Sequence, residues 1–210
     1  MPYSMRQYAV WAQPTAKHGG IGNLGDIPAN RHSLRKLIEL TQTSRIHLAP
    51  VQNLIREDVS LSYKLIRLLN SSYFGMSRRV DSVRKAVSFY GVDRLNNWAA
   101  VLLANAQDLS DDEWSRKALR RARACEAAAR EFGETAMEAY YLAGLFSTLP
   151  ELTGASLELI LPPLRLDEAI HDALMEGAGR MGKVLQSVIA HENFGSDYAR
   201  AYWARPPVLF

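Results

Sequence analysis

Cysteine is almost missing from this chain of 210 residues, which contains it once, at Cys125. A single thiol excludes an internal disulfide and any CxxC motif. Cys125 lies in the alanine-rich stretch RARACEAAAR, where a small buried thiol is expected rather than a reactive nucleophile. Thiol chemistry is therefore not expected to carry the function.

Histidine is missing from the middle of the chain. The five histidines are His18, His32, His47, His171 and His191. A metal site in a helical protein needs several imidazole and carboxylate ligands that converge from different helices. Because the central helices contain no imidazole, the adjacent pair His171 and Asp172 is interpreted as the exposed side of an amphipathic helix.

Long apolar runs and the common catalytic motifs are absent as well. No stretch approaches the ~18 consecutive apolar residues that cross a bilayer. The first residues, MPYSMRQYAVW, lack the basic start and apolar core of a signal peptide, so a cytoplasmic protein without membrane contact is expected. The chain contains neither a GxxxxGK[ST] phosphate loop nor a GxSxG nucleophile motif.

Charge of one sign does not dominate the composition. The formal net charge of +3 is too small to indicate nucleic-acid binding by itself. The most basic stretch follows Trp114 and contains Arg116, Lys117, Arg120, Arg121 and Arg123. If several of these cations share one helix face, they form a contact surface for nucleic acid or for an acidic protein, whereas the acids on either side favour a solvated helix.

Helical periodicity is what the sequence does contain. Residues 1–30 include Pro14, Pro28 and several glycines without a sustained period, and they are interpreted as an arm or linker. From Ser33 onward apolar residues repeat at helical spacing, and no stretch alternates convincingly with period two. An all-α fold is expected for residues 31–205, as a compact bundle of about eight to ten helices joined by short loops.

Two of the expected helices meet in the stretch LLNSSYFGMSRRVDSVRKAVSFYG, residues 68–91. Asp58 is the expected N-cap of the helix before the bend, and Ser82 and Gly91 are the expected N-cap and stop of the helix after it. An ordinary turn here would place Asn70 in a left-handed backbone conformation and let Ser71 bond locally. The alternative is that the stretch marks a protein family.

The wider stretch REDVSLSYKLIRLLNSSYFGMSRRVDSVRKAVSFYGVDRL, residues 56–95, resembles the core signature of the HDOD family, which comprises helical domains related to HD-type phosphohydrolases. The matching positions are Asp58, Leu61, Leu65, Leu68, Asn70, Ser71, Phe74, Ser82, Ala86, Gly91 and Leu95. The resemblance extends over residues 31–203 and implies an HD-like helical bundle. The signature residues are interpreted as building the fold, with Phe74 in the core and no catalytic role for any of them.

A second stretch, AYYLAGLFSTLPELTG at residues 139–154, resembles the helix that carries the His-Asp metal ligands in catalytic HD relatives. Ser147 and Thr148 stand at the two metal-ligand positions, and Pro150 replaces a glycine. The resemblance therefore implies this fold without the metal site, without a cofactor and without catalysis. Both hydroxyl groups are expected at the end of a helix, bonded to the backbone or to each other.

The segment GDIPANRHSLRKLIEL, residues 25–40, resembles the junction found in bacterial proteins where an EAL domain precedes an HDOD domain. EAL domains bind or hydrolyse cyclic di-GMP, and no EAL motif occurs here, so a fragment of a longer protein or a stand-alone relative is expected. Ile27, Pro28 and Leu34 are expected to pack on a neighbouring chain or to fold back on the helical body. Residues 25–35 are expected to contribute to a partner surface and to self-association.

Three functions stay open on the sequence alone. The first, favoured because the HD-type metal ligands are missing, is a non-catalytic bacterial signalling module that contacts a protein partner or an attached signalling domain, with a link to cyclic di-GMP. The second is a divergent metal-dependent phosphohydrolase that uses His171, Asp172 and His191. The third is a nucleic-acid-binding domain that uses the basic helix around Arg120.

Overall fold

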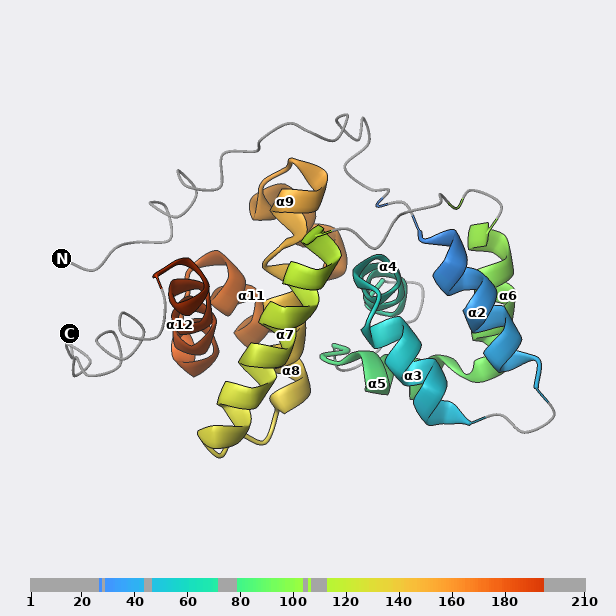
Figure 1. The fold of residues 1–210 in the computed structure, drawn as a ribbon, viewed down its shortest axis with the longest axis horizontal. Coiled ribbons are helices and arrows are strands. Elements are labelled where there is room, and N and C mark those ends of the chain that lie inside the picture. Colours follow the sequence, from blue (N-terminus) through green and yellow to red (C-terminus); the bar gives the residue numbers. More distant parts are fainter. Residues whose placement is uncertain are drawn as a thin grey trace.

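The structure is a computed structural model, and it describes residues 27, 29–43, 47–71, 79–103, 106 and 113–194. Within these ranges the secondary-structure elements are all helices and none is a strand, which confirms the all-α prediction (Figure 1). Nine helices of the described part have eight residues or more, in agreement with the expected number. A search of the same ranges for a helix long and apolar enough to cross a bilayer finds none.

The helices fall into two groups along the chain. The first group is α2 (Arg31–Thr41), α3 (Leu48–Arg56), α4 (Val59–Leu69), α5 (Val83–Tyr90) and α6 (Val92–Leu103). The second is α7 (Glu113–Glu131), α8 (Met137–Phe146), α9 (Leu149–Thr153), α10 (Leu157–Ile160), the 3-10 helix η1 (Pro162–Leu164), α11 (Glu168–Met175) and α12 (Gly179–Phe194). In Figure 1, α2 and α6 lie at one end of the molecule, α12 lies toward the other, and α4 is the part of the first group that lies near the middle, beside the second group.

Capping side chains set the ends of the helices in the signature stretch. Asp58 Oδ1 accepts a hydrogen bond from the Leu61 N–H at 2.9 Å, and Ser82 Oγ accepts one from the Lys85 N–H at 3.2 Å, so both predicted N-caps are confirmed. Gly91 follows α5 with a φ of 84°, a conformation that other residues rarely adopt, and the predicted stop is also confirmed.

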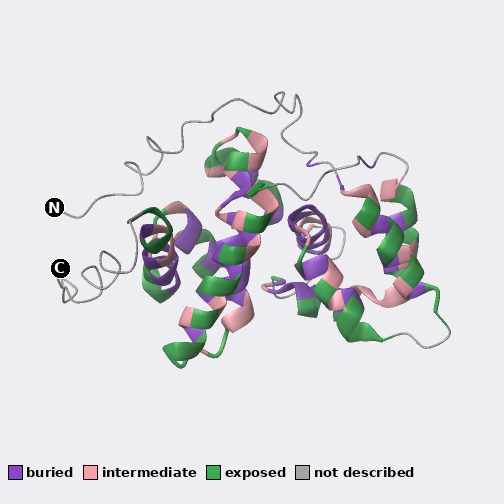
Figure 2. Cartoon of the chain, in the orientation of Figure 1, coloured by how far each residue is buried: buried purple, intermediate pink, exposed green. Residues whose placement is uncertain are grey.

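The core continues from the first group of helices into the second. Leu61 and Leu65 of α4 are fully buried, whereas Leu68 is half-buried, and α4 is almost wholly buried in Figure 2. The rings of Tyr63 in α4 and Phe146 in α8 meet edge to face, with centroids 6.3 Å apart. Because every residue of α8 from 139 to 146 is buried, this contact ties the centre of one group to the centre of the other.

Helices α7 and α8 cross at unusually close range beside Gly144. A Cβ atom at this position would lie 2.9 Å from the Ala122 Cα and 3.0 Å from the Cys125 Sγ, both on α7. The small side chains on this side of α7 let the two backbones approach each other. Cys125 is only 1% exposed, and burial raises the pKa of its thiol to about 12, which confirms a buried thiol that stays protonated at neutral pH.

The segment before α2 folds back on the helical body. Ile27 and Ala29 are each 3% exposed, and Leu34 is fully buried. Asn30 caps α2 by accepting a hydrogen bond from the His32 N–H at 2.9 Å. Ile27 and Leu34 thus adopt one of the two expected placements, while Pro28 lies outside the described residues. Recognition of a partner through residues 25–35 stays a prediction. The apolar side chains of Ile27 and Leu34 within this segment are covered by the chain itself.

Gly144→Ala is expected to lower the free energy of unfolding by about 1 to 3 kcal/mol, because the added methyl group overpacks the crossing of α7 and α8. Intrinsic helix propensity acts in the opposite direction, since alanine stabilises a helix interior by about 1 kcal/mol relative to glycine. Urea unfolding followed by circular dichroism measures the balance. A variant at least as stable as the parent would show that the helices do not meet this closely.

Two substitutions at Asp58 separate the contribution of its helix cap from that of its carboxyl charge. Asp58→Ala removes the cap and is expected to cost about 1 kcal/mol, whereas Asp58→Asn keeps a capping oxygen. Burial raises the pKa of Asp58 above its ordinary 3.8, although hydrogen bonds from Leu61 and Ser33 oppose that rise. The folded protein therefore binds this proton more readily than the unfolded chain, so the parent gains stability relative to Asp58→Asn as the pH falls through that raised pKa.

The measurement is a series of urea unfolding curves of the parent and Asp58→Asn from neutral to acidic pH. If the parent instead loses stability relative to Asp58→Asn as the pH falls, the carboxyl group is better solvated than its surroundings indicate.

Candidate functional site

The bend after α4 is closed by the side chain of Asn70, which is 1% exposed. Its Oδ1 accepts a hydrogen bond from the Val80 N–H at 2.8 Å, and its Nδ2 donates to the Val80 carbonyl at 3.3 Å. One amide group therefore holds the chain before α5 against the end of α4. The predicted left-handed conformation is wrong: with φ of −80° and ψ of −1°, Asn70 still bonds through its N–H to the Ile66 carbonyl and keeps helical geometry.

The other signature residues of the bend make local or core contacts. Ser71 Oγ donates to the Leu68 carbonyl at 2.6 Å, which confirms the predicted local bond. Ser82 is 2% exposed and Ala86 is fully buried. Phe74 lies outside the described residues, so its place in the core stays a prediction. The contacts of the described signature residues agree with a role in building the fold.

Ser147 and Thr148 lie where α8 ends and α9 begins. Ser147 Oγ donates to the Gly144 carbonyl at 2.7 Å, and Thr148 Oγ1 donates to the Leu145 carbonyl at 2.8 Å. Both hydroxyl groups therefore bond to the backbone of α8, as the sequence led us to expect. Thr148 is fully buried, and its own carbonyl accepts a hydrogen bond from the Trp114 indole at 3.0 Å.

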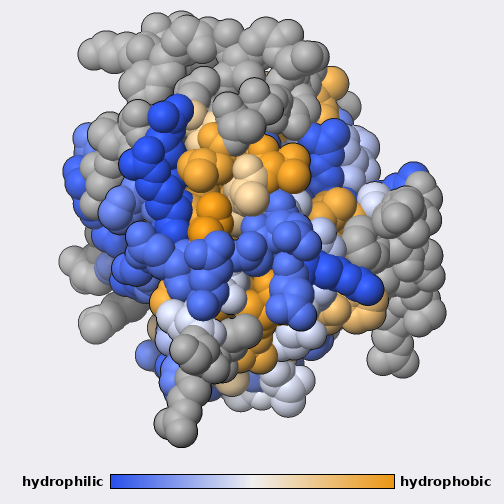
Figure 3. All heavy atoms as spheres, turned by 90° about the vertical axis from the view of Figure 1, so that its right-hand side faces the viewer, coloured by the Kyte–Doolittle hydropathy of each residue, from blue (hydrophilic) through white to orange (hydrophobic). Residues whose placement is uncertain are grey.

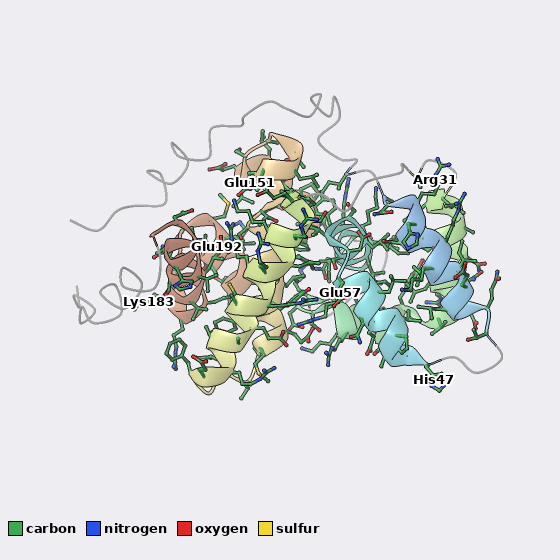
Figure 4. All side chains as sticks on the ribbon, viewed as in Figure 1. Arg31, His47, Glu57, Glu151, Lys183 and Glu192 are labelled. Carbon is green, nitrogen blue, oxygen red and sulfur yellow. The ribbon has the colours of Figure 1, made fainter. Side chains whose placement is uncertain are left out.

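A buried guanidinium group lies beside Ser147. Arg121 of α7 is 5% exposed and donates through Nη1 to Ser147 Oγ at 3.1 Å. Its Nε and Nη2 reach the Glu192 carboxylate of α12, at 3.0 and 2.7 Å from Oε2. Oε1 of Glu151 in α9 lies 4.0 Å from Arg121 Nη2. Figure 4 labels both glutamates, which approach α7 from α9 and from α12. Arg121 and Glu192 thus form an ion pair of opposite charges beside Ser147.

Arg121 is the residue whose role the sequence did not indicate. It stands in a run of cations that suggested an exposed surface, yet it is buried. The small residues around Arg121 could have indicated its burial. Ala118, Ala122 and Cys125 follow the buried side of α7 at helical spacing, and position 121 lies beside them. Its partner Glu192 lies 71 positions away in sequence, which no local pattern reveals.

Two of the remaining cations of the basic stretch pair with carboxylates from other segments. Lys117 Nζ lies 2.9 Å from Glu151 Oε1, and Arg123 Nη2 lies 2.7 Å from Oε1 of Glu57, the residue that directly follows α3. Arg116 and Arg120 are exposed. The carboxylates of Glu57, Glu151 and Glu192 therefore offset at least three of the five positive charges, and these ion pairs connect segments that are far apart in the sequence.

A second buried arginine connects the two groups of helices. Arg56 of α3 lies over the Tyr141 ring of α8, with its guanidinium carbon 3.4 Å from the ring centroid, and it pairs with Glu126 of α7. The Tyr141 hydroxyl donates to the Arg56 carbonyl at 3.0 Å. Burial raises the pKa of Tyr141 to about 12, so this hydroxyl group remains a donor at neutral pH.

The histidines of the second hypothesis do not form a metal site in the described part of the chain. His171 is exposed on α11, and its Nδ1 lies 3.2 Å from Oδ1 of the adjacent Asp172. His191 is exposed near the end of α12. Among the residues that the structure describes, no group of three His, Cys, Asp or Glu side chains could hold a metal ion.

Comparisons with known proteins connect the chain to signalling proteins. A family model described as HDOD domain matches residues 27–158. An uncharacterized protein of Bacillus subtilis (strain 168), YuxH, is 28% identical over 156 residues, which cover 71% of this chain and 38% of YuxH. The cyclic di-GMP phosphodiesterase CdgJ of Vibrio cholerae serotype O1 is 31% identical over 137 residues, 64% of this chain and 32% of CdgJ. The chain thus spans less than half the length of these curated relatives.

A solved structure shares the fold. The MmoQ response regulator from Methylococcus capsulatus str. Bath aligns with a TM-score of 0.66 over 86% of this chain and 93% of that chain. At 19% sequence identity this likeness concerns the fold alone. The expected domain limits at residues 31 and 205 stay predictions.

Glu192→Gln is expected to lower the free energy of unfolding by about 2 to 4 kcal/mol, because it leaves the buried Arg121 guanidinium without its anion. The double variant Arg121→Met with Glu192→Gln removes the uncompensated charge and is expected to recover part of the loss. Lys117→Met is the matched control: Lys117 and Glu151 are each more than a third exposed, so breaking that pair is expected to cost less than about 1 kcal/mol.

Chemical unfolding of the four proteins gives the free energies for this comparison. Equal losses in the free energy of unfolding for Glu192→Gln and Lys117→Met would mean that Arg121 is hydrated in solution and that its ion pair with Glu192 does not stabilise the fold.

Proposed function

Because the chain belongs to the HDOD family, whose model matches residues 27–158, we propose that it is a non-catalytic bacterial regulatory module that acts through contact with another protein. The observation that carries this proposal is the cluster at Ser147. There the hydroxyl groups of Ser147 and Thr148 bond to the helix backbone, and Arg121 with Glu192 fills the adjacent space.

The residues at this position do not fit a catalytic divalent metal. Such a metal requires imidazole and carboxylate ligands, which here are replaced by two hydroxyl groups, and it supplies the Lewis acid for phosphoester hydrolysis. The Arg121 Nη1 lies 3.1 Å from Ser147 Oγ, so a cation bound by this hydroxyl would meet a fixed positive charge a few ångströms away. The Glu192 carboxylate is already bonded to that guanidinium group.

A role in cyclic di-GMP signalling is part of the proposal. It is supported by the similarity to CdgJ, a cyclic di-GMP phosphodiesterase of which this chain matches 32% of the length. The chain therefore corresponds to part of such a protein, and we assign to it a regulatory contact rather than turnover of the nucleotide.

The test combines metal analysis of the purified protein with a phosphodiesterase assay over cyclic dinucleotides and generic phosphoesters. We expect no stoichiometric metal and no turnover, with His171→Ala indistinguishable from the parent. Stoichiometric metal together with turnover that His171→Ala abolishes would overturn the proposal in favour of a divergent phosphohydrolase.

Binding to random DNA and RNA at increasing salt is the second arm of the test. A surface that reads phosphates must lose affinity steeply as salt rises. We expect no such binding, because carboxylates offset Lys117, Arg121 and Arg123. Tight, salt-sensitive binding that Arg120→Ala weakens would favour the nucleic-acid hypothesis.

A further inference from the structure

We draw no further inference here: the strongest candidate, the patch of hydrophobic side chains at the end of the molecule where α2 and α6 lie (Figure 3), with Val101 of α6 72% exposed, carries none because nothing in the described part of the structure shows what covers it.

Discussion

The ion pair between Arg121 and Glu192 is the interaction on which the second half of the fold depends. A buried guanidinium group without an anion is strongly destabilising, so α12 must bring Glu192 to α7 for the bundle to close. The same guanidinium donates to Ser147, where the family resemblance places a metal ligand. One arginine thus joins α7, α8 and α12 and supplies positive charge at that position.

The two groups of helices are joined by contacts that are equally specific. Arg56 meets the Tyr141 ring and Glu126, and Tyr63 meets Phe146, so the junction combines an ion pair with aromatic packing. The Asn70 amide fixes the bend beside this junction.

Local chemistry made much of the fold predictable from the sequence. The caps at Asp58 and Ser82 and the stop at Gly91 depend on neighbouring residues, and the structure confirms all three. The conformation of Asn70 was mispredicted because propensity favours a left-handed turn residue, whereas the bonds to Val80 hold its side chain. The burial of Arg121 depends on Glu192, 71 positions away, and therefore needed the tertiary structure.

We expect the Arg121 guanidinium group to stay beside Ser147 in solution, as it does in the structure, and to exclude a divalent metal there. Nitrogen NMR of the arginine side chains during titration with Mn²⁺, a paramagnetic ion that broadens nearby signals, tests it directly. We expect a slowly exchanging Arg121 Nε–H signal that stoichiometric Mn²⁺ leaves unchanged. Selective broadening of that signal at stoichiometric Mn²⁺ would contradict this expectation, because it would place a metal beside Ser147.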